Sequence, residues 1–135
     1  MLTAYATCGI VTPMEEPHRL KRIVWIGSSR KDLKSFPDDV KDLMGYALYQ
    51  AQRGGKALSA KPLTDFGGAG VLEIVADHQT DTYRAVYTIK FGDFLYVLHA
   101  FQKKSKRGVT TPKADIALIK ARLKAAEVDY KTRHE

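Results

Sequence analysis

The side chains best suited to acid–base and phosphate chemistry gather in one stretch, from Tyr83 to Lys113. Arg84 lies in one run of aromatic and β-branched residues, and His99 lies in the next. An arginine in an apolar strand needs an anionic partner, and a histidine can gain or lose a proton near neutral pH. The candidate catalytic residues are therefore Arg84, His99, Lys103 and Lys104, and the candidate RNA-binding cations are Lys90, Lys106, Arg107 and Lys113.

Cleavage of RNA without a metal ion is one reaction that these side chains could support. It needs a group that takes the 2′-hydroxyl proton, cations that stabilise the phosphorane, and a group that protonates the leaving 5′-oxygen. Arg84 and the lysines suit the second task, and His99 suits proton transfer. The alternative is structural: a lone histidine in an apolar run is often a packed core residue, and Arg84 could be an ordinary sheet-face arginine.

A β-hairpin is predicted to position these groups. Its strands are Tyr83 to Phe91 and Phe94 to Phe101, with only Gly92 and Asp93 between them. Because side chains alternate along a strand, Tyr83, Ala85 and Tyr87 should face the core, and Arg84 should face a groove on the other side.

The rest of the chain predicts an α+β fold, with an antiparallel sheet, an N-terminal helical hairpin and a C-terminal helix. Strands are expected over 21–27 and 71–76, a helical hairpin over 29–53 interrupted at Pro37, and a loop over 56–70. Within the hairpin, Met44, Tyr46 and Tyr49 are expected to pack in the core. The last helix should begin at Thr111 and Pro112 and bury Ile116, Ile119, Leu123 and Ala126. Its outer face should then carry Lys113, Lys120, Arg122 and Lys124.

Length and composition indicate one domain that interacts with an anionic partner. The chain has 135 residues, a net charge of +7 and a single cysteine, Cys8. It lacks HExxH, CxxC, GxSxG and paired-carboxylate motifs, so we expect no metal and no cofactor. With no apolar run long enough to span a membrane and no export signal, we expect a cytoplasmic protein. Residues 1–20 are expected to form a flexible arm or extension, and residues 21–135 the domain.

Several segments together resemble a known family. They are WIGSSRKDLKSFP, GYALYQAQRGG, GVLEI, YRAVY, YVLHAFQKKS and TPKADI, in order between about Arg22 and Ala126. This series is similar to the phage-derived HigB-like branch of the RelE/ParE superfamily of toxins. The resemblance implies the small RelE-like (microbial RNase-like) fold and a cognate antitoxin, typically of the helix-turn-helix type.

The resemblance also implies a type II toxin that cuts mRNA on the ribosome without metal. Arg84 matches a strand arginine that contacts the scissile phosphate in the RelE branch, and Lys103 and Lys104 match basic residues after the last strand. Glu73 and its neighbours stand where that branch has lysines, so His99, Lys104 or a tyrosine would have to move the protons. Two alternatives remain: a ParE-like inhibitor of DNA gyrase and a catalytically inactive RNA-binding relative.

Overall fold

The computed structural model describes residues 20–54, 60–63, 66, 70–103 and 111–133. In chain order the elements are β2 (Arg22–Trp25), α2 (Ser29–Lys34), α3 (Asp38–Gln52), β3 (Ala60–Pro62), β4 (Val71–His78), β5 (Asp81–Thr88), β6 (Phe94–Lys103) and α4 (Lys113–Arg133). The predicted arm over residues 1–20 lies outside the described residues except for Leu20.

The five strands form one sheet in the order β2-β6-β5-β4-β3. Strands β3 to β6 pair antiparallel with their neighbours, whereas β2 pairs parallel with β6. The α+β class is therefore confirmed, but the sheet is mixed rather than wholly antiparallel. The reason is that α2 and α3 follow β2 and carry the chain to the opposite edge of the sheet before the antiparallel strands begin.

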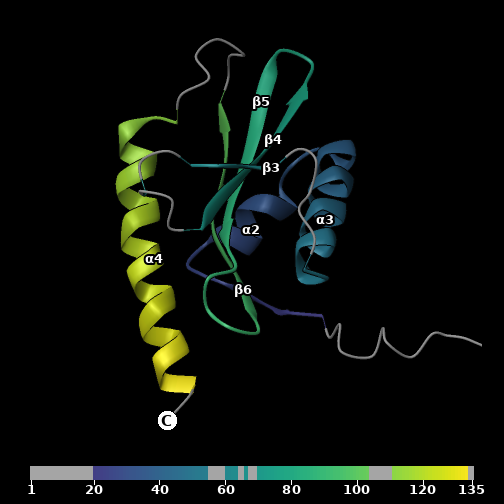
Figure 1. Cartoon of the computed structure of the whole chain (residues 1–135). Helices are drawn as coiled ribbons and strands as arrows, with labels where there is room; N and C mark the ends of the chain where they lie inside the picture. The colour runs from purple at the N-terminus through teal and green to yellow at the C-terminus, as the bar shows by residue number, and fades with distance from the viewer. Residues whose placement is uncertain (1–19, 55–59, 64–65, 67–69, 104–110, 134–135) are drawn as a thin grey trace, which may run out of the picture.

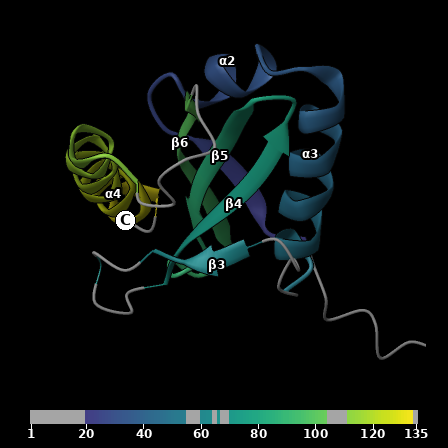
Figure 2. The same ribbon diagram turned by 90° about the horizontal axis from the view of Figure 1, so that it is seen from above.

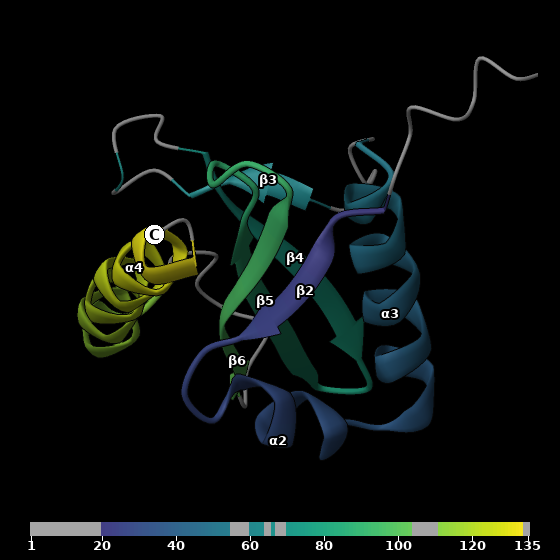
Figure 3. The same ribbon diagram turned by 90° about the horizontal axis from the view of Figure 1, so that it is seen from below.

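The helices cover the sheet on both faces (Figures 1 and 2). Helices α2 and α3 lie on one face and α4 lies on the other, so the domain has three layers. Seen from below, α4 remains on the side of the sheet opposite α3 (Figure 3). Side chains on that face of the sheet, such as Val86, Leu98 and His99, are therefore directed toward α4.

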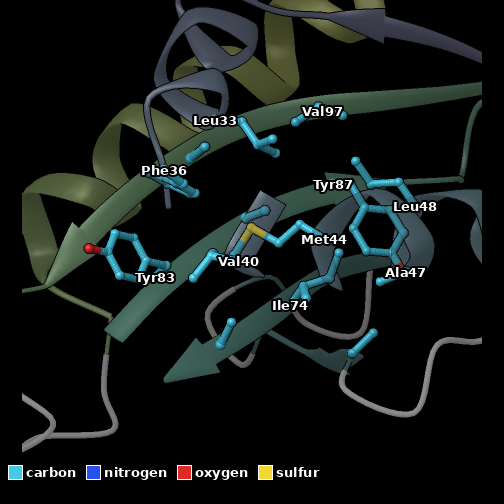
Figure 4. Close-up of a cluster of buried hydrophobic side chains, with 14 of the residues drawn as sticks. Leu33, Phe36, Val40, Met44, Ala47, Leu48, Ile74, Tyr83, Tyr87 and Val97 are labelled. Atoms are coloured by element: carbon cyan, nitrogen blue, oxygen red, sulfur yellow. The ribbon is translucent and has the colours of Figure 1, made fainter. Parts of the chain in front are cut away.

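A large apolar core fills the space between the sheet and the helices α2 and α3 (Figure 4). Met44 is fully buried against the strands, and Tyr83 and Tyr87 point into the same core, as the strand alternation predicts. Tyr46 and Tyr49 are 64% and 43% exposed, so the prediction that they pack in the core is wrong. They lie on the outer side of α3.

A second core lies between the sheet and α4. It contains Ile116, Ile119 and Ala126 of the helix, with Leu123 packed against it, and Val86 and Leu98 among the strand residues. The predicted apolar face of α4 is thus confirmed. The turn at Gly92 fits tightly against this helix: a Cβ on Gly92 would come within 2.7 Å of the Tyr130 hydroxyl, and Gly92 has a φ of +57°.

Two strand predictions differ from the structure. β3 lies within the segment that was predicted to be a loop. The strand was not predicted because three residues that include a proline carry almost no strand signal. Strand β5 ends at Thr88, so five residues rather than two connect it to β6. A register shift between Val86 and Tyr87 accompanies this change, as a β-bulge would produce.

Candidate active site

Arg84 is buried on the α4 face of β5 and is only 3% exposed. Its Nη1 donates to both carboxylate oxygens of Glu73, at 3.2 and 3.1 Å, and Glu73 is 1% exposed. Thr111 completes the cluster: its hydroxyl donates to Glu73 Oε2 at 2.7 Å and accepts from Arg84 Nη1 at 3.4 Å. The anionic partner that the sequence requires for Arg84 is therefore within the protein, and the predicted open groove is replaced by a closed contact.

His99 lies on the same sheet face and contacts α4. Its Nε2 is 2.7 Å from Asp115 Oδ1, and its Nδ1 is 3.4 Å from Arg122 Nη1. The imidazole also stacks on Phe101 at 4.8 Å between ring centroids. A neutral imidazole satisfies both polar contacts when Nε2 carries the proton, since Asp115 accepts and Arg122 donates. Asp115 therefore favours the tautomer in which Nε2 carries the proton and the Nδ1 lone pair accepts from Arg122.

Arg84 and His99 lie near one another on the sheet. Arg84 pairs with Phe101 across the β5–β6 ladder, and His99 precedes Phe101 by two residues on the same strand face. The two side chains are thus diagonal neighbours, for which Cα separations are about 7–8 Å. The sheet thus brings together Arg84 and His99, two of the four predicted catalytic residues. The beginning of α4 lies over both.

Arg122 belongs to this group, contrary to the prediction that it lies on the outer face of α4. Its Nη1 donates to the Leu98 carbonyl oxygen at 3.0 Å, and its Nη2 donates to Ser28 Oγ at 3.3 Å. Ser28 in turn donates to Asp32 at 2.7 Å. Within the described chain, no carboxylate forms an ion pair with Arg122. This guanidinium is therefore held by neutral groups, unlike that of Arg84.

The remaining predicted cations fall in different places. Lys103 is half-buried at the end of β6, Lys113 is exposed at the start of α4, and Lys90 is exposed with its Nζ 5.5 Å from the centroid of the Phe91 ring. Lys104, Lys106 and Arg107 lie outside the described residues.

The sequence analysis missed three functional candidates, Glu73, Asp115 and Arg122. One signal was available on α4: Asp115, Arg122 and Asp129 are spaced by seven residues, or two helical turns, and so share the sheet-facing side. Each contacts β6, Asp129 through a hydrogen bond of 2.8 Å from the Tyr96 hydroxyl. Polar residues at the spacing of the buried face of α4 are therefore a sequence signal for a row of polar contacts between α4 and β6, here called the polar seam.

The far end of this seam is a structural cluster. Burial and then the contact with Asp129 raise the pKa of Tyr96 to about 12. The hydrogen bond from Arg133 to Asp129, at 2.6 Å, lowers the pKa of the Asp129 carboxyl. Both pKa shifts favour a protonated Tyr96 hydroxyl beside an ionised Asp129 carboxylate. This cluster anchors the end of α4 against β6.

No three His, Cys, Asp or Glu side chains among the described residues are arranged to hold a metal ion. No helix in that part of the chain is both long and apolar enough to cross a membrane.

The chain belongs to the Gp49-like family of phage-derived proteins (DUF891), whose profile matches residues 31–124. This family is part of the RelE/HigB toxin superfamily and is associated with toxins of toxin–antitoxin systems, which implies a cognate antitoxin as partner. No curated protein and no solved structure matched the chain significantly. The matched region begins in α2 and ends in α4, so it includes Glu73, Arg84, His99, Asp115 and Arg122.

Proposed function

We propose that this protein is a ribosome-dependent mRNA endonuclease that acts as the toxin of a type II toxin–antitoxin system. The observation that carries the proposal is the His99–Asp115 pair, with 2.7 Å between Nε2 and Oδ1. An imidazole oriented by a carboxylate is a common device for proton transfer, because the carboxylate fixes the tautomer and stabilises the imidazolium. The net charge of +7 supports an RNA substrate.

In the proposed reaction, His99 Nδ1 takes the proton of an RNA 2′-hydroxyl. The 2′-oxygen forms a bond to the adjacent phosphorus, the bond from phosphorus to the 5′-oxygen breaks, and water protonates that oxygen. The products are a 2′,3′-cyclic phosphate and a 5′-hydroxyl. His99 is itself only 6% exposed, so its Nδ1 becomes accessible when the long contact with Arg122, at 3.4 Å, opens and the substrate hydroxyl replaces it. Asp115 then faces a positively charged imidazolium.

Arg84 has a supporting role in this scheme. Because Arg84 is 3% exposed and paired with Glu73, it acts on the substrate only through the local charge and the packing of Phe101 beside His99. The ribosome supplies the positioning of the mRNA, and free RNA is a poor substrate for this reason.

Inducible expression with mapping of mRNA 5′ ends tests the proposal. The wild-type protein should arrest growth and produce new 5′ ends within translated reading frames. His99→Gln should remove both effects, whereas Lys124→Gln, on the exposed side of α4, should retain them. Growth arrest without new 5′ ends would instead indicate another target such as DNA gyrase.

The inactive RNA-binding relative is the second candidate. The specific observation in its favour is the burial of Arg84 against Glu73. Arg84 is the cation expected at the scissile phosphate, and its partner is instead an internal carboxylate. This candidate predicts neither growth arrest nor new 5′ ends, together with RNA binding that weakens steeply as salt concentration rises.

A further inference from the structure

Arg122 differs from Arg84 in the one respect that matters for binding a phosphate. Arg84 is 3% exposed and has a carboxylate partner, whereas Arg122 is half-buried and contacts a carbonyl oxygen, a hydroxyl and an imidazole. An arginine without a carboxylate partner retains its affinity for an external anion. Of the two arginines beside His99, Arg122 is the one that an RNA phosphate can reach without breaking an ion pair.

The contacts of Arg122 leave one edge of the guanidinium available. Nη1 is directed toward the Leu98 carbonyl and His99, and one N–H of Nη2 is directed toward Ser28. Nε has no hydrogen-bond partner among the described residues, and Nη2 has only the long contact of 3.3 Å to the Ser28 hydroxyl there. Nε–H and the Nη2–H parallel to it form the edge of a guanidinium that can bind a phosphate through two hydrogen bonds.

Gly27 lies next to that edge. A Cβ on Gly27 would lie 2.8 Å from both Cζ and Nε of Arg122 and 2.9 Å from Nη2, so the backbone of Gly27 packs on the face of the guanidinium and not on its edge. Gly27 and Ser28 are themselves exposed, and the φ of Gly27 is +60°. The loop therefore lies over the Nε and Nη2 side of the guanidinium, next to the edge that a phosphate would approach.

We propose that Arg122, with the loop of Gly27 and Ser28, is a binding site for a phosphate of the RNA backbone and positions the strand beside His99. The inference rests on the proposed function for its ligand, and it replaces Arg84 with Arg122 as the arginine that contacts RNA. Asp32 accepts from the Ser28 hydroxyl at 2.7 Å and keeps Ser28 in place.

Phosphate binding can be measured without any cleavage. Backbone amide signals of the ¹⁵N-labelled protein are followed by NMR during titration with inorganic phosphate and with a 2′-O-methyl RNA trinucleotide, which cannot be cut. Saturable shifts are expected at Gly27, Ser28 and Leu98. Arg122→Gln should weaken this binding about tenfold, the loss expected for charge-assisted hydrogen bonds, and Lys124→Gln should leave it unchanged.

A second variant guards against a folding defect in Arg122→Gln. Ser28→Asp places a carboxylate next to Nη2 from an exposed position, and it should weaken phosphate binding about tenfold while the fold is retained. Shifts that cluster away from Gly27 and Ser28, or equal affinity in wild type and Ser28→Asp, would overturn the inference. If phosphate binds as expected but expression produces no new mRNA ends, the nuclease proposal fails and the phosphate site remains.

Discussion

Glu73 and Arg84 form an ion pair that is closed off from solvent, with 3.1 Å between Nη1 and Oε2 and exposures of 1% and 3%. Removal of one member leaves a buried charge without its partner, which typically costs about 3–5 kcal/mol. Replacement of both by apolar residues of similar size is often neutral or stabilising. The pair therefore adds little net free energy of unfolding. Through Thr111, it fixes how the start of α4 is arranged on the sheet.

We expect Arg84→Met to lower the free energy of unfolding by about 3–5 kcal/mol, and Glu73→Leu to do the same. The double variant should recover most of this loss, because no charge is then left buried. Urea denaturation of the four proteins gives the coupling energy directly. Additive losses in the double variant would show that the two side chains do not depend on one another.

Two buried tyrosines provide a matched comparison. The Tyr87 hydroxyl has no hydrogen-bond partner among the described residues, whereas the Tyr96 hydroxyl donates to Asp129 at 2.8 Å. Tyr87→Phe should leave the free energy of unfolding unchanged or raise it, since it removes an unsatisfied polar group. Tyr96→Phe should lower it by about 1–2 kcal/mol. Equal effects of the two substitutions in urea denaturation would contradict this assignment.

The raised pKa of Tyr96 predicts a loss of stability at high pH. The pKa is about 12 in the folded protein and about 10 when the chain is unfolded, so the unfolded state releases this proton first. The contribution of Tyr96 is complete below pH 10 and is lost as the pH rises from 10 toward 12. Tyr96→Phe should therefore show a shallower fall in the free energy of unfolding over this window. Because burial also raises the pKa of Tyr87, a spectrophotometric titration of the phenolates at 295 nm should show one late-ionising group fewer in Tyr96→Phe than in the wild type.

Glycine substitutions test how closely α4 fits the sheet. Gly27→Ala should destabilise by about 1 kcal/mol, because Gly27 has a positive φ of +60°, and the new Cβ should displace the Arg122 guanidinium, which it would meet at 2.8 Å. Gly45 lies within α3 with nothing inside 4 Å of its Cβ position. Gly45→Ala should stabilise by about 0.5–1 kcal/mol. A thermal melt of both variants separates them by the sign of the shift in Tm.

The periodic elements could be predicted from the sequence, and the contacts between them could not. The three- and four-residue spacing of Ile116, Ile119, Leu123 and Ala126 correctly identified the buried side of α4, and the alternation along β5 placed Tyr83 and Tyr87 in the core. Both patterns are set by burial, which acts on neighbouring residues along one element.

The polar contacts of the candidate site were harder to predict. Glu73 and Thr111 are 38 residues apart, and Ser28 and Arg122 are 94 apart, so no local pattern links them. Arg122 was assigned to the outer face because its charge suggested exposure. Its position three residues after Ile119 places it at the border of the buried face, where a long side chain can turn inward.

The most direct test of the account is a cleavage assay with purified components. The protein is incubated with ribosomes carrying a defined mRNA, and with the same mRNA alone, and the 5′ ends of the products are mapped. For a ribosome-dependent nuclease, the cuts should require the ribosome, leave 2′,3′-cyclic phosphates and disappear in His99→Gln. Lys124→Gln should be as active as the wild type. An intact mRNA in every reaction, or equal cleavage by His99→Gln, would contradict the nuclease proposal.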